Sequence, residues 1–373
     1  MEFSEDGYTI RLNEIEIELL RKEFLLLKFL YTNNGRTFSR EELLDVIWPH
    51  EFPTDRTVDD HIYRLRKKLN SLQDDITIKT IKGLGYRLEV KERVDETPTS
   101  VPKEIEKQAN ELFDTYYKYG QGKALRELLT NKVLGLALNE KQETVLLWLN
   151  SDFKALLKRL ADTKNAIVPL LLYGFVESDT EKVIDAHKRV LDEGRLDEKE
   201  RMDISCFSLS LWYMKFGRPE TSLQLVQQEI DGIRDIHHGF FPFLNVMKSA
   251  ILFYQNKLDE AKRSIENTEI LLRQLPYLRE TSALRVLQGL LLIRDGDEKA
   301  GREKIEEGRG LIRQSGHTYY LLFIYQLLKL LLPNSGASKE TIQFYDQAAE
   351  RYMEETELEQ LKPKIESQLI SLI

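Results

Sequence analysis

The chain has 373 residues, of which 42% are hydrophobic, and its formal net charge is −8 at pH 7. This length suffices for two domains, or for one small domain followed by a repeat array. The negative charge argues against a protein that coats nucleic acid along its whole length, and the single cysteine, Cys206, excludes a disulfide framework within the chain.

No segment of the sequence indicates export or membrane insertion. The acidic N-terminus lacks the apolar stretch of a signal peptide. The apolar run Leu321 to Leu332 is interrupted by Tyr325, Gln326 and Lys329, so it is too short and too polar to span a bilayer. We therefore expect a soluble, cytoplasmic protein without a membrane partner, in which Cys206 is a small core residue.

The N-terminal part of the chain alternates between strand and helix patterns. Residues 8–12 and 15–19 alternate apolar and polar side chains, which predicts two half-buried strands. Residues 21–31 change to helical spacing, and Asn33-Asn34-Gly35 ends that helix. Ser39-Arg40-Glu41-Glu42 is a capping-box pattern that opens a second helix, which ends at Trp48-Pro49.

A third helix has one apolar face and one basic face. It runs to about Leu69, with Thr57 as its expected cap, and the side chains predicted to pack inward are Val58, Ile62, Leu65 and Leu69. Two strands follow, residues 76–81 and 86–90, around Lys82-Gly83-Leu84-Gly85, where glycine permits a tight hairpin. An exposed basic helix beside a cationic hairpin tip is suited to grip a duplex. The sequence thus predicts an α+β winged helix over residues 1–92 that binds double-stranded DNA.

This segment resembles the winged-helix effector domain of the OmpR/PhoB response-regulator family over about residues 8 to 90. Four motifs stand in family order and spacing: Glu23-Phe24-x-Leu26-Leu27, Ser39-Arg40-Glu41-Glu42-Leu43-Leu44, the run from Arg56 to Leu69, and Thr80-Ile81-Lys82-Gly83-x-Gly85-Tyr86-Arg87. The resemblance implies that the third helix lies in the major groove and that the hairpin reaches the neighbouring minor groove.

The resemblance also implies roles for single side chains. Arg64 is expected to read a base, because a guanidinium can donate two hydrogen bonds to guanine. Thr57, His61, Arg66 and Lys68 are expected to bind phosphates and set the register on the duplex. The full predicted DNA-binding set is Arg56, Thr57, Asp60, His61, Tyr63, Arg64, Arg66, Lys67, Lys68 and Lys82.

Three positions carry an open question. Lys82 stands where the family usually has arginine, which implies a weaker and less shape-selective minor-groove contact. Asp60 stands where family members commonly have an apolar residue; facing the groove, it repels phosphate or accepts from a cytosine amino group. Arg66 has a second interpretation, an ion pair with Glu41 or Asp59.

The loop from Trp48 to Asp55 has two interpretations. It resembles the segment that contacts RNA polymerase in activators of this family, which makes RNA polymerase a candidate partner. The alternative is a plain connector around a buried Trp48.

The source of the control signal is expected to lie in the C-terminal part. In two-component regulators this domain follows a phosphorylated receiver domain, but here it begins at the N-terminus, so we expect no receiver. Residues 93–102 are polar with two prolines, Pro98 and Pro102, which predicts an extended linker.

From Lys103 to residue 373 the sequence predicts only helices and turns, with an internal repeat. The turn residues Gly217, Asn256 and Gly296 lie 39 and 40 residues apart. Small residues recur at matching positions of the paired helices: Ser210, Ser249 and Gly289, then Ser222, Ala261 and Gly301. This pattern resembles degenerate tetratricopeptide repeats, in which small residues let paired helices approach closely, and it predicts an all-α superhelix over residues 103–373.

The positions predicted to line the inside of this superhelix are all apolar, so something must cover them. Three coverings are open: tight winding of the superhelix, closure by the C-terminal segment Leu358 to Ile373, or a bound apolar peptide or partner helix. The candidate groove for such a ligand or partner consists of Phe207, Leu211, Met214, Asn245, Lys248, Phe253, Arg285 and Gln288.

No motif indicates catalysis, a metal or a cofactor. His237 and His238 are adjacent and would point apart on a helix, without further ligands at metal spacing. Gly308-Arg309-Gly310 is not followed by the Gly-Lys-Ser/Thr of a phosphate loop. We therefore expect no enzyme.

Two functions are compatible with the sequence. The first is a sequence-specific transcription regulator, a homodimer controlled by a ligand, peptide or partner bound to its repeats. This architecture resembles regulators of the SARP class and Gram-positive regulators whose repeats bind short signalling peptides. The alternative is an interaction protein whose repeats capture another protein, such as a response regulator, with DNA binding secondary.

Overall fold

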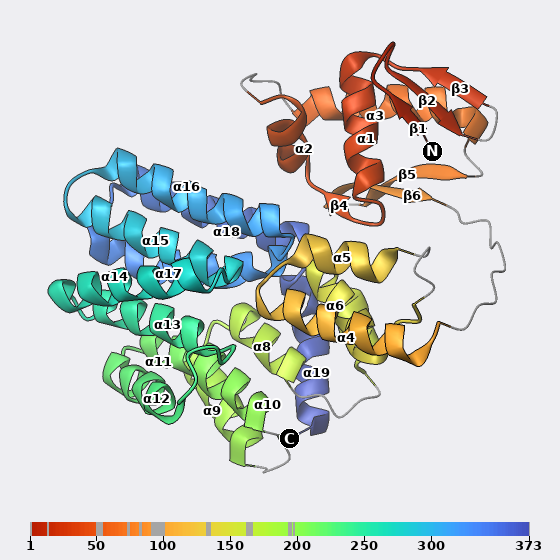
Figure 1. Cartoon of the computed structure of the whole chain (residues 1–373). Helices are drawn as coiled ribbons and strands as arrows, with labels where there is room; N and C mark the ends of the chain where they lie inside the picture. The colour runs from red at the N-terminus through yellow and green to blue at the C-terminus, as the bar shows by residue number, and fades with distance from the viewer. Residues whose placement is uncertain are drawn as a thin grey trace. The chain divides into compact units, whose positions relative to one another are not determined.

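The computed structural model describes residues 2–12, 15–49, 55–72, 75–81, 84–90, 101–131, 136–161, 167–192, 196 and 198–372. The chain divides into two compact units, Met1–Pro98 with Glu354–Thr356 and Thr99–Met353 with Glu357–Ile373. The division along the chain falls inside the predicted linker 93–102. In Figure 1 the colour runs from red to orange along Met1–Pro98 and from orange to blue along the helices that follow.

The first unit combines two small sheets with three helices. Its sheets are antiparallel and have the strand orders β1-β2-β3 and β4-β6-β5. Its elements are β1 (Glu2–Ser4), β2 (Thr9–Leu12), β3 (Ile15–Glu18), α1 (Arg21–Thr32), β4 (Thr37–Phe38), α2 (Arg40–Ile47), α3 (Asp55–Lys68), the 3-10 helix η1 (Leu69–Leu72), β5 (Ile76–Ile81) and β6 (Gly85–Val90). The predicted α+β winged helix is confirmed, while the short strands β1 and β4 were not predicted.

Local signals account for the starts of two helices. Ser39 Oγ accepts a hydrogen bond from the Glu42 N–H at 3.1 Å, and the Glu42 carboxylate accepts from the Ser39 N–H at 2.9 Å, so the predicted capping box opens α2. Helix α3 is already helical at Asp55. Thr57 therefore lies inside the helix, and the prediction that it caps α3 was wrong.

Helix α3 buries one face in the core of the first unit. Val58, Ile62 and Leu65 have no exposed surface, and Leu69, the first residue of η1, is 3% exposed. The three- and four-residue spacing of these side chains predicted this face. Because α3 packs on both α1 and α2, its opposite side is left facing outward.

In the second unit all the described elements are helices. They are α4 (Lys103–Lys118), α5 (Gly122–Thr130), α6 (Glu140–Leu149), α7 (Phe153–Arg159), α8 (Ile167–Val176), α9 (Thr180–Asp192), α10 (Glu198–Met202), the π-helix η3 (Asp203–Leu209), α11 (Ser210–Lys215), α12 (Pro219–Gly232), α13 (Phe241–Tyr254), α14 (Leu258–Gln274), α15 (Leu278–Arg294), α16 (Glu298–Ser315), the 3-10 helix η4 (Thr318–Tyr320), α17 (Leu321–Ser335), α18 (Lys339–Glu355), the 3-10 helix η5 (Glu359–Leu361) and α19 (Lys362–Leu372). The predicted all-α region is confirmed.

The predicted turn residues connect paired helices. Gly217, Asn256 and Gly296 lie between α11 and α12, α13 and α14, and α15 and α16, and Gly336 lies at the matching place between α17 and α18. All four have a positive φ, from 59° to 97°, which glycine and asparagine adopt most readily. The repeat seen in the sequence is thus a repeat of helical hairpins.

The small residues mark the closest approach of paired helices. A Cβ added to Gly289 of α15 would lie 2.5 Å from the carbonyl oxygen of Gly301 in α16, and a Cβ on Gly301 would lie 2.6 Å from that of Gly289. At the matching position of an earlier hairpin, Ser222 Oγ donates to the Ser210 carbonyl at 2.7 Å. Larger side chains at these positions would push the backbones apart.

Three of the predicted groove positions lie in a filled part of the helical unit. Leu211, Met214 and Phe253 are at most 1% exposed. Helix α17 packs against α13 and α15, and the Phe323 ring lies 5.4 Å from that of Phe207. At the three buried positions tight winding therefore leaves no open groove, whereas Phe207 lines a cavity in the same unit.

The polar members of the predicted groove do not meet at one site. Asn245 donates to the Phe241 carbonyl of its own helix at 2.8 Å, and Lys248 is half-buried. Arg285 binds Glu269 of α14 at 3.1 Å and Gln288 at 2.7 Å. Arg285 and Gln288 therefore join neighbouring helices.

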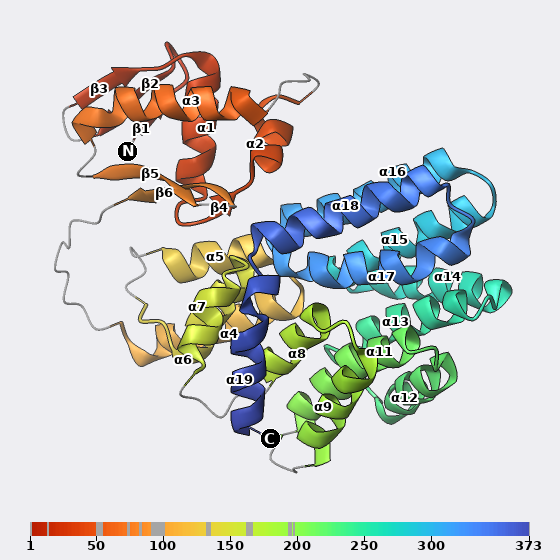
Figure 2. The same ribbon diagram turned by 180° about the vertical axis from the view of Figure 1, so that it is seen from behind.

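The C-terminal helix covers a different part of the unit. Figure 2 shows α19, in dark blue, beside α8. The Gln368 amide donates to the Leu157 carbonyl at 2.6 Å, and Lys362 lies 3.1 Å from Glu177. The C-terminal segment thus packs on α7 and α8.

The structure also bears on Cys206, on metal binding and on membrane insertion. Cys206 is fully buried, and burial raises the pKa of its thiol to about 12, so it is a core residue. Within the described ranges, no cluster of His, Cys, Asp and Glu could hold a metal ion, and none of the helices is long and apolar enough to cross a bilayer.

The close approach of α15 and α16 can be tested on one helix. Gly301→Ala is expected to lower the free energy of unfolding by about 1–3 kcal/mol, because the new methyl group meets backbone atoms. Gly310→Ala is the matched control; nothing lies within 4 Å of its Cβ, and the better helix former should add about 0.5–1 kcal/mol. Thermal unfolding followed by circular dichroism measures both. Equal melting temperatures for the two variants would contradict the packing.

Candidate nucleic-acid interface

The outward face of α3 is a continuous stripe of exposed side chains. Successive residues of a helix turn by about 100°, so positions 56, 60, 63, 64 and 67 fall within an arc of about 100° opposite the buried face. All five side chains are exposed, and Tyr63 keeps 69% of its surface. We call this stripe the α3 face; it consists of Arg56, Asp60, Tyr63, Arg64 and Lys67.

The α3 face is free to accept a ligand. None of its five side chains makes a hydrogen bond or ion pair with a described residue. Three of them are cations and one, Asp60, is an anion. The face therefore offers a local excess of positive charge in a chain whose net charge is −8.

One flank of α3 is joined to the hairpin through Asp59. The Tyr86 hydroxyl of β6 donates to the Asp59 carboxylate at 2.6 Å, and Arg40 Nε of α2 donates to the same oxygen at 2.7 Å. Burial alone would raise the pKa of Asp59, but these two donors outweigh it and lower the pKa. Asp59 thus stays ionised and ties α2, α3 and β6 together.

Arg66 strengthens the same connection. Its Nε donates to the Ile78 carbonyl at 2.9 Å, and its Nη2 donates to Thr80 Oγ1 at 2.8 Å, both on β5. The alternative that Arg66 pairs with Glu41 or Asp59 was wrong. The predicted phosphate contact of Arg66 would have to form while these bonds hold the guanidinium on β5.

The other flank of α3 is joined to α1 by an ion pair with a buried carboxylate. Lys68 Nζ donates to Glu23 Oε2 at 2.8 Å and to the Glu18 carbonyl at 3.1 Å. Glu23 is 1% exposed. Burial alone would raise the pKa of Glu23, but hydrogen bonds from Lys68 and the Leu20 N–H lower it. The stabilisation is thus present above the ordinary pKa of 4.5 and is lost as the pH falls through the lower folded-state value.

His61 and Thr57 lie between this flank and the α3 face. Both side chains are half-buried. His61 Nδ1 lies 2.8 Å from the Thr57 carbonyl, and its ring meets that of Trp48 edge-on at 5.0 Å. Trp48 is 4% exposed, as the connector interpretation of its loop expects, whereas residues 50–54 of that loop lie outside the described residues.

The hairpin requires glycine at position 85. Gly85 has a φ of 123°, and a Cβ there would lie 2.0 Å from the Phe38 carbonyl oxygen of β4. Any side chain would therefore break the pairing of β4 with β6. Lys82, the predicted minor-groove contact, lies outside the described residues.

The structure thus places nine of the ten predicted DNA-binding residues. Five form the α3 face, Thr57 and His61 lie beside it, and Arg66 and Lys68 are bound to other elements. The roles of Arg40, Tyr86 and Glu23 were not predicted. Tyr86 belongs to the motif Thr80 to Arg87, but the spacing of that motif does not indicate that the Tyr86 hydroxyl reaches Asp59.

Comparisons with known proteins agree with this geometry. Residues 14–88 match the family described as "Transcriptional regulatory protein, C terminal". Over 77 residues the chain is 49% identical to the transcriptional regulatory protein VxrB of Vibrio cholerae, a match that covers 20% of this chain and 30% of VxrB. Over 90 residues it is 42% identical to the phosphate regulon transcriptional regulatory protein PhoB of Rhizobium meliloti, which covers 24% and 40% of the two chains.

A third relative is the transcriptional regulatory protein SrrA of Staphylococcus aureus, 39% identical over 94 residues that cover 24% of this chain and 39% of SrrA. The chain spans less than half the length of each of these relatives. The N-terminal unit is an OmpR/PhoB-type winged-helix DNA-binding domain, and a large all-helical region follows it along the chain.

Two adjacent lysines separate a structural role from a binding role. Lys68→Met is expected to lower the stability of the N-terminal unit by about 3 kcal/mol, because it leaves the Glu23 carboxylate buried without its cation. Lys67→Met, on the α3 face, is the matched control and should change stability by no more than about 0.5 kcal/mol. Hydrogen–deuterium exchange of α1 and α3 in the full chain measures the difference. Equal protection in both variants would show that the ion pair has no structural role.

Proposed function

We propose that this chain is a sequence-specific DNA-binding transcription regulator. The observation that carries the proposal is the α3 face: it is exposed, basic and unpaired, while both flanks of the helix are tied down. A rigid helix presenting three cations is what insertion into a major groove requires. Arg64 is the residue we assign to base reading, and Arg56 and Lys67 are assigned to phosphates.

The remaining predicted contacts receive smaller roles. Arg66 and Lys68 position α3, because their charged groups are already bonded to β5 and to Glu23. Lys82 extends the contact into the minor groove. Asp60 lies between Arg56 and Arg64 on the same stripe, so it weakens attraction to the phosphates and is retained for selectivity.

One domain of this kind binds DNA weakly, which supports a homodimer. Each phosphate neutralised contributes about 0.9 to the slope of affinity against salt on logarithmic scales. The three cations of the α3 face therefore provide only a small electrostatic contribution, and the rest of the chain is acidic. Two copies on spaced half-sites double the number of contacts and explain how such a domain reaches specific affinity.

We assign control of DNA binding to the helical unit. Its hairpins, with small residues at each close contact, are consistent with degenerate tetratricopeptide-like repeats. A ligand or partner that changes the relative placement of two winged helices would favour or disfavour binding to paired half-sites. This function needs no catalytic residue. The alternative of an interaction protein is less well supported, because α17 fills the groove that a captured helix would occupy.

The α3 face predicts two distinct losses of DNA binding. With a site selected from random DNA by the full chain, Arg64→Ala should weaken binding by about 1–3 kcal/mol and relax the preference at one base position. Lys67→Met should weaken binding to all sequences alike and reduce the salt slope by about 1. Gel-shift titrations at several salt concentrations measure both. Failure of the wild-type chain to prefer the selected DNA over random DNA would falsify the proposed function.

A substitution at Asp60 is expected to strengthen DNA binding instead of weakening it. Asp60→Asn removes a negative charge from the α3 face at nearly constant shape, so affinity for random DNA should rise by several-fold and the salt slope should steepen. The same titrations measure this change. If Asp60→Asn instead lowered affinity only for DNA sites that have cytosine at one position, Asp60 would be shown to accept a hydrogen bond from the amino group of that base.

A further inference from the structure

The helical unit contains a cavity of about 850 Å³. Its walls come from α4, α6, α8, α10, η3, α13, α15, η4 and α17, together with residues 238–240. This volume lies in the range of sites that hold small organic molecules, about 300–1,000 Å³. Asp114 and Lys141 line its edge; they form an ion pair at 2.6 Å and keep 62% and 55% of their side chains exposed, so this edge is open to solvent.

One side of the cavity is aromatic. Its rings come from α6, α8, η3, α13 and α17, with Phe240 just before α13. Phe207, Phe243 and Phe323 form a cluster with ring centroids 5.0 to 5.6 Å apart. The aromatic lining consists mainly of Trp148, Phe175, Phe207, Phe240, Phe243 and Phe323.

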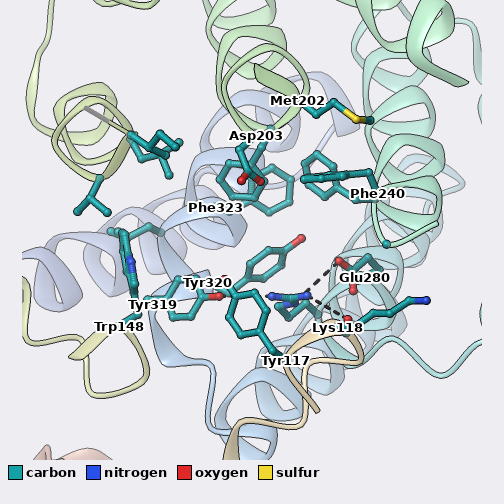
Figure 3. Close-up of a pocket in the computed structure, with 18 of the residues that line it drawn as sticks. Tyr117, Lys118, Trp148, Met202, Asp203, Phe240, Glu280, Tyr319, Tyr320 and Phe323 are labelled. Carbon is teal, nitrogen blue, oxygen red and sulfur yellow. Dashed lines mark hydrogen bonds and ion pairs between the residues drawn. The ribbon is translucent and has the colours of Figure 1, made fainter. Parts of the chain in front are cut away.

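The opposite side of the cavity, which we call its floor, is polar, and some of its buried polar atoms lack hydrogen-bond partners among the described residues. Figure 3 shows Tyr117, Tyr319, Tyr320 and Glu280 around this floor, with the Tyr320 hydroxyl pointing into the cavity. Tyr320 is 3% exposed and Glu280 is 4% exposed, yet the Tyr320 hydroxyl and Glu280 Oε2 have no hydrogen-bond partner among the residues that the structure describes. A buried polar atom without a partner costs about 1–3 kcal/mol.

Arg279 completes the floor. Its Nη2 donates to the Lys118 carbonyl at 3.2 Å and its Nη1 to the Tyr319 hydroxyl at 3.5 Å. Its Nε has no hydrogen bond, and the nearest carboxylate oxygen, Glu280 Oε1, lies 3.9 Å away. The Arg279 guanidinium cannot be deprotonated, so its Nε–H remains a donor without an acceptor among the described residues.

Two of the unpartnered groups, Arg279 Nε and the Tyr320 hydroxyl, can donate to an added acceptor. Burial raises the pKa of Glu280, although Arg279 opposes the shift. Two further carboxylates line the cavity: Asp114 at the exposed edge, and Asp203 of the π-helix η3, which Figure 3 shows near Phe323. π-Helical turns are frequent at functional sites.

We propose that this cavity binds a small organic acid, with its apolar body among the phenylalanine rings and its carboxylate accepting hydrogen bonds from Arg279 and Tyr320. The ligand would satisfy the polar atoms that the protein alone leaves without partners. It would also join α4 to α15 and α17, because Arg279 holds the carbonyl of Lys118 at the end of α4. Helix α4 follows directly on the predicted linker, so the ligand is the controlling signal if the proposed function holds.

Three naphthalene probes with different head groups test this site. 2-Naphthylacetate, 2-naphthylacetamide and 2-(2-naphthyl)ethylamine share one apolar body and carry an anion, a neutral amide and a cation. Isothermal titration of the full chain should give naphthylacetate an affinity at least about 10-fold above the other two, because charge-assisted hydrogen bonds are the stronger ones. Equal affinities, preference for the amine, or no heat of binding with any probe would overturn the proposal.

Two variants assign the preference to named residues. Arg279→Met should abolish the preference for the acid, whereas Glu280→Gln should retain it; the reverse pattern would indicate a cationic ligand. Tyr320→Phe provides a second test that does not depend on the Arg279 variant being folded. It should weaken naphthylacetate binding by about 5-fold or more without lowering the melting temperature, because its hydroxyl has no partner to lose. A lower melting temperature with unchanged binding would make Tyr320 merely structural.

DNA binding is measured separately in the same samples. A change in DNA affinity on addition of naphthylacetate, absent in Tyr320→Phe, would connect the site to regulation. Probe binding by a chain that does not bind DNA would leave the site intact and reject the proposed function, so the two failures are distinguishable.

Discussion

The carboxylate of Asp59 holds the recognition helix and the hairpin in one arrangement. It accepts from Tyr86 and from Arg40 at the same oxygen, so a single charge joins three elements of the first unit. A helix inserted in one groove and a hairpin directed at the next must keep a fixed separation, because the spacing of the grooves is set by the duplex. In the proposed function, the α3 face acts from a helix whose flanks are held in this way.

The two units bond their carboxylates differently. In the winged helix, the buried Glu23 and the partly exposed Asp59 each have a close cation and a further donor, so these carboxylates remain ionised and hold neighbouring elements together. In the helical unit, Arg279 and Glu280 are adjacent in sequence and lie at the start of α15, but their contact is long and leaves a polar atom of each without a partner among the described residues. A carboxylate with a close cation specifies a single geometry, whereas unpartnered polar atoms beside a cavity are available to a ligand.

Sequence patterns predicted those features that depend on local spacing. The capping box at Ser39, the buried face of α3 and the turns at Gly217 and Gly296 all follow from periods of a few residues. The partners of Arg66 and the burial of Glu280 could not be predicted, because they depend on which elements meet in three dimensions. Helix α17 was an intermediate case: apolar side chains cover most of its surface, with Gln326 and the exposed Lys329 on the remaining side. Such a pattern indicates a largely surrounded helix, but not which helices surround it.

Phe323 of the hairpin α17–α18 contacts Phe207 of η3, just before the hairpin α11–α12, and Phe243 of the hairpin α13–α14. The fourth helical hairpin therefore packs against the first and the second. Open solenoids grow or shrink by whole repeats, since each repeat touches only its neighbours. Here, inserting or deleting one hairpin would carry α17 away from η3 and dismantle the aromatic cluster. The number of hairpins is therefore not free to vary, and this array must diverge during evolution by substitution within its hairpins instead of by duplication.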